Sequence, residues 1–152
     1  MVIDVEKLKQ LREETGAGIL EIKRILEETN GDFVKAKEGL MKKVASKVAK
    51  KSNRVAKDGL VFSYIHNGGK VGSLVLIGCE TDFVAKTDDF KKLCQEVSMQ
   101  VCAEDFDNVE KLLESEYIRD PFKKIQDLVN ETSAKTGEKI EIVKFTKFSV
   151  GE

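Results

Sequence analysis

The chain has 152 residues, of which 41% are hydrophobic and 35% charged, and its formal net charge is −1. This length accommodates one ordinary domain, or a small module beside a core of about a hundred residues that buries enough apolar surface to fold unaided. No apolar run approaches the roughly twenty residues that span a membrane, and the first seven residues carry two acids and no hydrophobic signal core, so we expect a cytoplasmic protein.

The first 46 residues predict three helices joined by very short turns. Asp4 can cap a first helix that Gly16 ends, and Asp32 can cap a third helix after the turn Asn30-Gly31. Each helix has its apolar residues at intervals of three or four, which places them on one face. These residues are Val5, Leu8 and Leu11, then Ile19, Ile22, Ile25 and Leu26, then Phe33, Ala36, Leu40, Val44 and Val48. The pattern predicts a three-helix bundle of the ubiquitin-associated type over residues 1–46.

A basic segment follows the bundle. Up to Asp58 the chain has 14 Lys and Arg against 10 Asp and Glu, and the remainder has 12 against 17. Seven of the cations lie between Lys42 and Lys57, an interval without acids, so we expect a linker at residues 47–58. Such a cluster can neutralise RNA phosphates. It lacks the aromatic residues on which single-strand binders stack bases, which favours a solvated face and no specific nucleic acid.

From residue 59 the periodicity changes to that of strands. Leu60–His66 and Lys70–Glu80 predict two antiparallel strands joined by the turn Asn67-Gly68-Gly69. A helix that Thr87 can cap follows them. Its apolar stripe comprises Phe90, Leu93, Cys94, Val97 and Val101.

The C-terminal third predicts a short helix at Val109–Leu113, a longer helix and a last strand. The longer helix is expected to open at Asp120-Pro121, because proline favours the first helical position, and to end at Gly137. Its inward residues would be Phe122, Ile125, Leu128 and Val129. The strand Lys139–Phe148 shifts its apolar residues between faces, which requires a bulge or cover on both faces. Residues 59–152 are thus expected to form an α+β core in which a small antiparallel sheet packs with helices.

The connection between the second strand and the helix after it, Glu80–Phe90, has an unusual composition. Asp82 and Phe83 place a charge beside a large apolar ring where a corner faces solvent. In one interpretation Phe83 folds back into the core and Asp82 caps the short turn that Phe83 begins. In the other, the corner is a contact element for a partner. The residue pattern leaves both interpretations open.

The cysteines and the single histidine exclude several classes of enzyme. Cys79, Cys94 and Cys102 are odd in number and lack the CxxC spacing of a metal or redox site, so we expect buried, reduced thiols. His66 alone supplies neither a zinc ligand set nor a catalytic triad. No glycine-rich phosphate loop is present in the sequence. We therefore expect no covalent catalysis, no metal and no cofactor.

Three parts of the sequence resemble one family. Thr81–Lys86 reproduces the signature TDFVA[KR] of bacterial elongation factor Ts. Leu11-Arg12, Thr15-Gly16-Ala17-Gly18 and Gly31-Asp32, with Ala36 and Leu40, resemble its N-terminal domain, and Glu116–Pro121 and Phe145–Glu152 resemble the segments that end its core. The resemblance covers nearly the whole chain. Because only one hairpin, one such corner and one closing strand occur, the chain resembles a short form with a single core half.

The resemblance implies a guanine-nucleotide exchange factor for elongation factor Tu. In that family the corner displaces the Mg²⁺ ion of the partner, a role that would fall to Thr81, Asp82, Phe83 and Val84, with Phe83 as the wedge. Arg12 would contact the partner's G domain. Ile19 and Leu20 would do the same, although the family usually has two methionines in their place.

His66, the pairing of two copies of the chain and an alternative function remain to be considered. His66, at the tip of the predicted hairpin, either contacts other domains of the partner or is a solvated turn residue. Two copies of the chain are expected to pair in place of the missing core half, through exposed sheet edges. The alternative function is a ubiquitin-associated-like adaptor, or a ribosome- or RNA-binding protein, without exchange activity.

Overall fold

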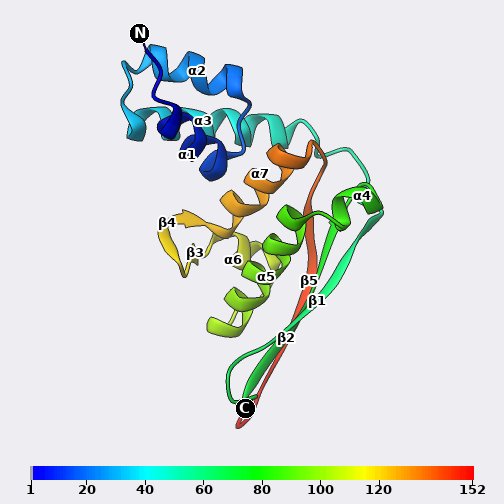
Figure 1. Ribbon diagram of the computed structural model, residues 1–152. Coiled ribbons are helices and arrows are strands. Elements are labelled where there is room, and N and C mark those ends of the chain that lie inside the picture. Colours follow the sequence, from blue (N-terminus) through cyan, green and yellow to red (C-terminus); the bar gives the residue numbers. More distant parts are fainter. Residues whose placement is uncertain (1) are drawn as a thin grey trace.

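The computed structural model describes residues 2–152 and has an α+β architecture. Its elements are α1 (Val5–Thr15), α2 (Ile19–Glu28), α3 (Phe33–Ala49), β1 (Asp58–Ile65), β2 (Val71–Cys79), α4 (Asp82–Ala85), α5 (Asp88–Ala103), α6 (Val109–Glu114), β3 (Glu116–Tyr117), β4 (Asp120–Lys124), α7 (Ile125–Thr136) and β5 (Glu141–Ser149). Figure 1 shows the three N-terminal helices at one end, with the long sheet extending away from them. The expected fold class of helices with a small antiparallel sheet is confirmed.

The three N-terminal helices form a bundle around their own core. Asp4 and Asp32 cap α1 and α3 as predicted, each accepting a backbone N–H within the first turn of its helix. Asn30 (φ 53°) and Gly31 (φ 80°) form the left-handed turn between α2 and α3. The buried side chains are Leu11, Ala17, Ile22, Ile25, Leu26, Ala36, Leu40 and Val44. The predicted inward positions of Val5 and Ile19 are wrong, because both side chains are exposed.

The main sheet has three antiparallel strands in the order β1-β2-β5. The predicted hairpin is confirmed, with Leu60 opposite Ile77. Between β2 and β5 the register shifts, since Leu76 pairs with Lys144 while the next residue of β2 pairs with Ile142. Val143 is therefore the bulge, which is how the last strand moves its apolar residues between faces.

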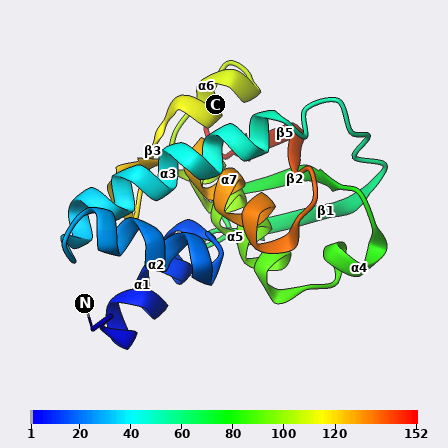
Figure 2. The same ribbon diagram turned by 90° about the horizontal axis from the view of Figure 1, so that it is seen from above.

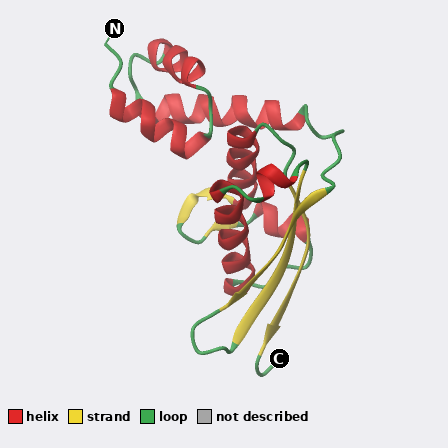
Figure 3. Ribbon diagram, turned by 45° about the vertical axis from the view of Figure 1, so that its right-hand side comes forward, coloured by secondary structure: helices red, strands yellow, loops and turns green. Residues whose placement is uncertain are grey.

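Successive layers lie on one face of the sheet. α5 packs against β1 and β2, α7 packs against α5, and α3 of the bundle packs against α7. Figure 3 shows α5 and α7 on the same side of the long strands. The core between them includes the predicted stripe of α5 and the inward side chains of β2. These residues are Val75, Ile77, Cys79, Phe90, Leu93, Cys94, Val97 and Val101. The sheet and the helices packed on it thus fix the position of the segment that follows β2 and leads into α4.

The prediction of a helix that opens at Asp120-Pro121 is wrong, because the segment that begins at Asp120 is a strand. β4 pairs with β3 in a short hairpin, and α7 begins only at Ile125. The carboxylate of Asp127 accepts the N–H of the N-cap residue Lys124 at 2.9 Å and so fixes the helix start at Ile125, four residues beyond the proline. Phe122, expected inward, is 95% exposed.

Candidate functional site

The corner after β2 is a single helical turn, α4, between two threonine caps. The Thr81 Oγ1 accepts the Val84 N–H at 3.4 Å, and the Thr87 Oγ1 accepts the Phe90 N–H at 3.2 Å. Thr87 also donates its hydroxyl to the Val84 carbonyl at 2.7 Å, which joins the two helices. The suggested cap at Asp82 is therefore wrong, because Thr81 occupies that position and Asp82 lies in the first turn. Asp82 instead forms an exposed ion pair with Lys86.

The side chains of α4 divide into an outer and an inner pair. Phe83 is 81% exposed and Asp82 is also exposed, whereas Val84 and Ala85 are buried in the core. The interpretation that places Phe83 in the core is therefore wrong. Of the four residues expected to act on a partner, Asp82 and Phe83 face outward, while Val84 holds the turn to its own protein. A turn anchored by buried side chains presents an apolar ring to solvent.

Glu138, which follows α7, braces the corner from a distant part of the sequence. One carboxylate oxygen accepts the backbone N–H groups of Glu80 and Thr81, each at 3.0 Å, and the other accepts the Thr81 hydroxyl at 2.7 Å. Ser133 in turn donates to the Glu138 carbonyl at 2.7 Å. Sequence reasoning missed this residue, because 57 positions separate it from Thr81 and no local motif marks it. Glu138 thereby holds two backbone N–H groups and one side-chain hydroxyl just before α4.

Cys79 lies directly under the corner. Its Sγ donates to the Thr81 carbonyl at 3.1 Å, and burial, with Glu138 and Asp58 nearby, raises the pKa of the thiol to about 11. Burial likewise raises the pKa of Cys94 to about 12. All three cysteines are free thiols; Cys79 and Cys94 are buried as expected, and Cys102 is half-buried. Cys79 is therefore a structural thiol and an internal reporter on the corner.

A second exposed apolar surface lies on the bundle, and we call Arg12, Ile19 and Leu20 the bundle patch. The Arg12 guanidinium donates to the Ala17 carbonyl at 3.0 Å, which holds it beside the turn before α2. All three side chains line one shallow depression, together with Arg24. Ile19 is 47% and Leu20 81% exposed, so Ile19 does not pack inward as the stripe predicts and both side chains face solvent. Three residues selected from separate positions in the sequence thus form one surface.

Comparison with known proteins shows to which family the chain belongs. A model of the family described as Elongation factor TS matches residues 80–152. Curated proteins named Elongation factor Ts from Thermoanaerobacter sp. (strain X514) and Thermotoga maritima are 40% and 39% identical; the alignments cover 99% and 100% of this chain and 96% and 98% of those proteins. The chain belongs to the elongation factor Ts family. It is accordingly a translation elongation factor, with a role in protein biosynthesis.

The alignment with a single relative also shows that this chain is shorter than that protein. The alignment with the Thermoanaerobacter protein extends over 196 positions, which exceeds the 152 residues of this chain. Because the alignment covers 99% of the chain and 96% of the relative, the additional residues of the relative lie inside the aligned region. Within the elongation factor Ts family, this chain is thus a shortened member.

His66 lies at the other end of the sheet from the corner. It follows β1, and its Nδ1 lies 3.0 Å from the Tyr64 hydroxyl. Figure 1 shows α4 at the end of the sheet nearest the bundle, and the β1–β2 turn at the opposite end, near the C-terminus. The nine residues of β2 separate the two by roughly 30 Å at about 3.3 Å per residue. His66 therefore does not join the corner.

The basic segment is attached to the α+β part by its own cations. Lys51 donates to the Ser133 carbonyl at 3.2 Å, and Arg54 donates to the Gly137 carbonyl at 3.1 Å and lies 3.5 Å from the Glu80 carboxylate. Burial lowers the pKa of Lys51. These two cations are therefore engaged within the protein, which weakens the RNA-binding alternative. The first part of the predicted linker is also helical, since α3 continues to Ala49.

Across residues 2–152, no group of His, Cys, Asp and Glu side chains has the arrangement of a metal site. No helix in the same range is both long and apolar enough to cross a membrane.

Proposed function

We propose that this protein is a guanine-nucleotide exchange factor for elongation factor Tu. The observation that carries the proposal is Phe83, which is 81% exposed at the tip of a turn whose flanking side chains, Val84 and Ala85, are buried. In the free protein the apolar ring of Phe83 stays in contact with water, and it leaves water only when a partner covers it. Its ring freezes only two torsions on insertion and gains about 2 to 3 kcal/mol on leaving water.

The proposed action is displacement of the partner's Mg²⁺ ion. Elongation factor Tu would hold GDP through a Mg²⁺ that requires near-ideal octahedral oxygen ligands, so a small shift of its surroundings weakens nucleotide binding. Phe83 would insert as the wedge, and Asp82 beside it would make polar contacts. Thr81 and Val84 would contribute by holding the turn, since one caps α4 and the other is buried. Insertion of Phe83 would then displace groups of the partner, because the backbone that carries Phe83 is held rigidly.

Exchange follows from linkage between two binding equilibria. A factor that binds nucleotide-free partner more tightly than GDP-bound partner weakens GDP binding by the same ratio, and about 1.4 kcal/mol of coupling gives a tenfold effect. No bond is made or broken in this process, so no catalytic acid, base or nucleophile is required. The proposal agrees with a cytoplasmic location, where translation takes place.

The bundle patch would supply a second contact, with the G domain of the partner. Arg12 provides a fixed guanidinium, and Ile19 and Leu20 provide exposed apolar area beside it. We propose that the bundle is of the ubiquitin-associated type and that the chain divides into residues 1–46, a linker at 47–58 and a core at 59–152. His66, at the far end of the sheet, would contact another domain of the same partner.

We also propose that two copies of the chain pair through sheet edges. β1 and β5 are the outer strands of the three-stranded sheet, so each leaves one edge unpaired. Exposed apolar side chains accompany both edges, with Val61 and Ile65 on β1 and Phe148 on β5. Light scattering at tens of micromolar is expected to give the mass of a dimer, and a monomer mass would contradict pairing.

Release of a fluorescent GDP analogue from elongation factor Tu tests the exchange function. The protein is added at a tenth of the partner's concentration, with excess unlabelled GDP present. We expect complete release at a rate well above the spontaneous one, because each molecule of the factor acts repeatedly. Release that stops at a tenth of the signal, or no acceleration, would contradict exchange and favour an adaptor.

A further inference from the structure

The bundle meets the α+β part at a close contact between a turn and a helix. Gly16, which ends α1 with φ 74°, lies against α7, and a Cβ at this position would come within 2.6 Å of the Glu131 carbonyl oxygen. Ala134 of α7 packs into the bundle's own core. Figure 2 shows α7 between α1 and α4. The relative position of the bundle patch and the corner therefore depends on how α1 sits on α7.

Lys123 of β4 joins three elements at this contact. It is only 7% exposed. Its Nζ donates to the Glu14 carbonyl of α1 at 3.0 Å and forms an ion pair with the Glu131 carboxylate of α7. One ammonium group thus connects the bundle to both the β3–β4 hairpin and the helix beneath it.

The chemistry of the two acceptors explains why a cation occupies this position. The Glu14 carbonyl belongs to the last turn of α1, where carbonyls lack intrahelical partners and carry the negative end of the helix dipole. The Glu131 side chain is only 14% exposed, and this partial burial raises the pKa of its carboxylate, an effect that the neighbouring Lys123 opposes. An apolar side chain of the same length would satisfy neither acceptor.

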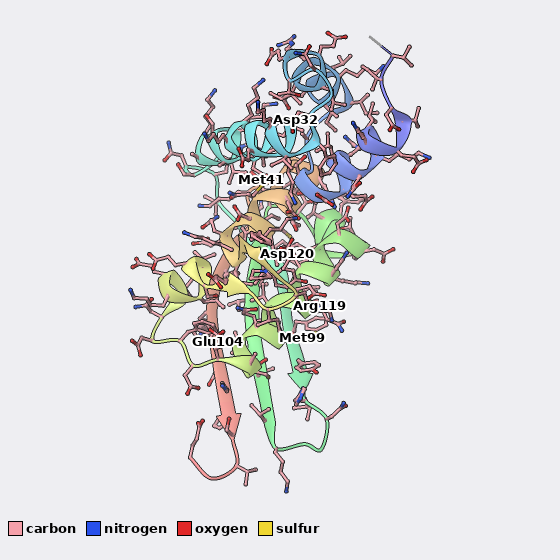
Figure 4. The ribbon with its side chains drawn as sticks, turned by 90° about the vertical axis from the view of Figure 1, so that its left-hand side faces the viewer. Asp32, Met41, Met99, Glu104, Arg119 and Asp120 are labelled. Atoms are coloured by element: carbon pink, nitrogen blue, oxygen red, sulfur yellow. The ribbon has the colours of Figure 1, made fainter. Side chains whose placement is uncertain are left out.

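The hairpin that carries Lys123 is itself fixed to α5. Gln100 donates to the Glu116 carbonyl at 2.7 Å and accepts the Ile118 N–H at 3.0 Å. Arg119 lies 3.3 Å from the Glu96 carboxylate and 3.7 Å from the Met99 sulfur, and Figure 4 shows Arg119 beside Met99. Since α5 begins directly after the corner, Lys123 connects α1 to the helix that continues from Phe83.

Other ion pairs at the same contact are peripheral. Lys135 lies 3.7 Å from Glu13, whose side chain is largely exposed, and Lys37 lies 2.9 Å from Glu14 within the bundle. The Lys135–Glu13 pair has one largely exposed partner and so contributes little to stability, and the Lys37–Glu14 pair does not cross the contact. Lys123 differs from Lys135 in being buried and in binding a main-chain atom of α1.

We propose that Lys123, with Glu131, is a positioning pair that holds the bundle patch at a fixed distance from the corner, so that both contacts with the partner form at once. This inference rests on the exchange function proposed above. Fixing two contacts in advance avoids the entropy cost of ordering one after the other. Loss of the link is therefore expected to weaken partner binding and to leave the wedge step at Phe83 intact.

Two variants test the proposal in the full-length chain. Lys123→Met leaves the Glu131 carboxylate buried without its cation, so it is expected to lower stability as well. Lys123→Met with Glu131→Leu removes both charges and keeps the apolar volume, but still lacks the bond to the Glu14 carbonyl. Lys135→Met is the matched control, because it removes a neighbouring ion pair whose acidic partner is largely exposed.

The first readout is the distance between spin labels at Glu28→Cys on the bundle and Lys91→Cys on α5, in a Cys102→Ala background. The distance distribution is expected to broaden in the double variant and to stay narrow in the control. The second readout is nucleotide exchange, where KM for the partner is expected to rise about tenfold with kcat unchanged.

The outcomes separate this inference from the proposed function. An unchanged distance distribution in the double variant would overturn the role of Lys123 whatever the exchange rates. A broadened distribution with unchanged KM would show that the link holds the bundle but does not serve partner binding, which also overturns the proposal. If the unmodified protein does not accelerate nucleotide release, the exchange function fails, while the distance measurement still decides whether Lys123 fixes the bundle.

Discussion

The corner and the bundle patch expose apolar side chains on backbones of different rigidity. Phe83 lies on a four-residue turn, and just before it two backbone N–H groups and the Thr81 hydroxyl donate to Glu138. Ile19 and Leu20 lie in the first turn of α2, whose N-cap, Gly18, has no side chain to cap it. The comparison indicates two kinds of contact: a single side chain on a stiff support, and an area on a surface that can adapt.

The two kinds of contact predict different kinetic effects. A wedge acts only as the nucleotide leaves, so its loss lowers kcat. A binding surface is used equally before and after that step, so its loss raises KM. Variants at the corner and at the bundle patch therefore test whether the two surfaces act differently, according to whether kcat or KM changes.

Phe83→Ala is expected to have the largest effect. It removes a ring that gains about 2 to 3 kcal/mol on leaving water, which corresponds to a fall in kcat of about 30- to 150-fold. Because the side chain is exposed in the free protein, the melting temperature is expected to stay within about 2 °C. Stopped-flow release of a fluorescent GDP analogue measures the rate.

Phe122→Ala is the matched control for this variant. Phe122 is even more exposed than Phe83 but lies on β4, away from the corner. Its removal tests whether loss of any exposed ring slows exchange. Equal losses in the two variants would assign the effect to general surface hydrophobicity and contradict a wedge at Phe83.

Glu138→Ala is expected to have the next largest effect, because it tests rigidity without touching Phe83. It leaves the backbone N–H groups of Glu80 and Thr81 without their acceptor, which costs about 2 to 3 kcal/mol of folding free energy. We expect kcat to fall about tenfold as the turn yields. Glu141→Ala, at an exposed position of β5, is the control.

Cys79 reports on the same variant independently of exchange. Burial holds its thiol pKa at about 11, so labelling at pH 8 requires local opening of the corner. Mass spectrometry of the labelled peptide is expected to show at least about tenfold faster modification of Cys79 in Glu138→Ala. Faster labelling with an unchanged exchange rate would show that the wedge does not need a rigid support.

Leu20→Ser is expected to raise KM by about five- to tenfold and leave kcat unchanged. The exposed side chain contributes apolar area only when the partner covers it, a gain of about 1 to 1.5 kcal/mol for partial burial. Val34→Ser changes another exposed apolar residue of the bundle, outside the patch, and serves as the control. A fall in kcat in Leu20→Ser would remove the distinction between the two surfaces.

Local chemistry explains which parts of this structure were predictable. Asp4, Asp32 and Thr87 cap the helices that the sequence predicts, because each cap bonds to a backbone group two or three residues away. The hairpin follows for the same reason from its Asn-Gly turn. Where neighbouring residues determine the backbone, sequence patterns suffice.

Sequence patterns failed where two local signals conflicted, or where a residue distant in the sequence determined the local structure. At Pro121 two local signals disagreed, and the carboxylate of Asp127 placed the helix start later than the proline suggested. Glu138 braces the corner and Lys123 joins the bundle to the core across long sequence separations. The exposed position of Phe83 is likewise a property of the assembled fold, since it depends on Val84 filling the core in its place.

His66→Ala is expected to have the smallest effect, a rise in KM of about twofold with kcat unchanged. The imidazole is exposed and already bonded to the Tyr64 hydroxyl, so a contact with the partner would replace one hydrogen bond with another, worth about 0.5 kcal/mol. Titration of the partner against the variant and against Asn67→Ala, in the same turn, measures the difference. Equal affinity of His66→Ala and the unmodified protein would identify His66 as a solvated turn residue, and would confine the partner to the end of the sheet that carries the corner and the bundle.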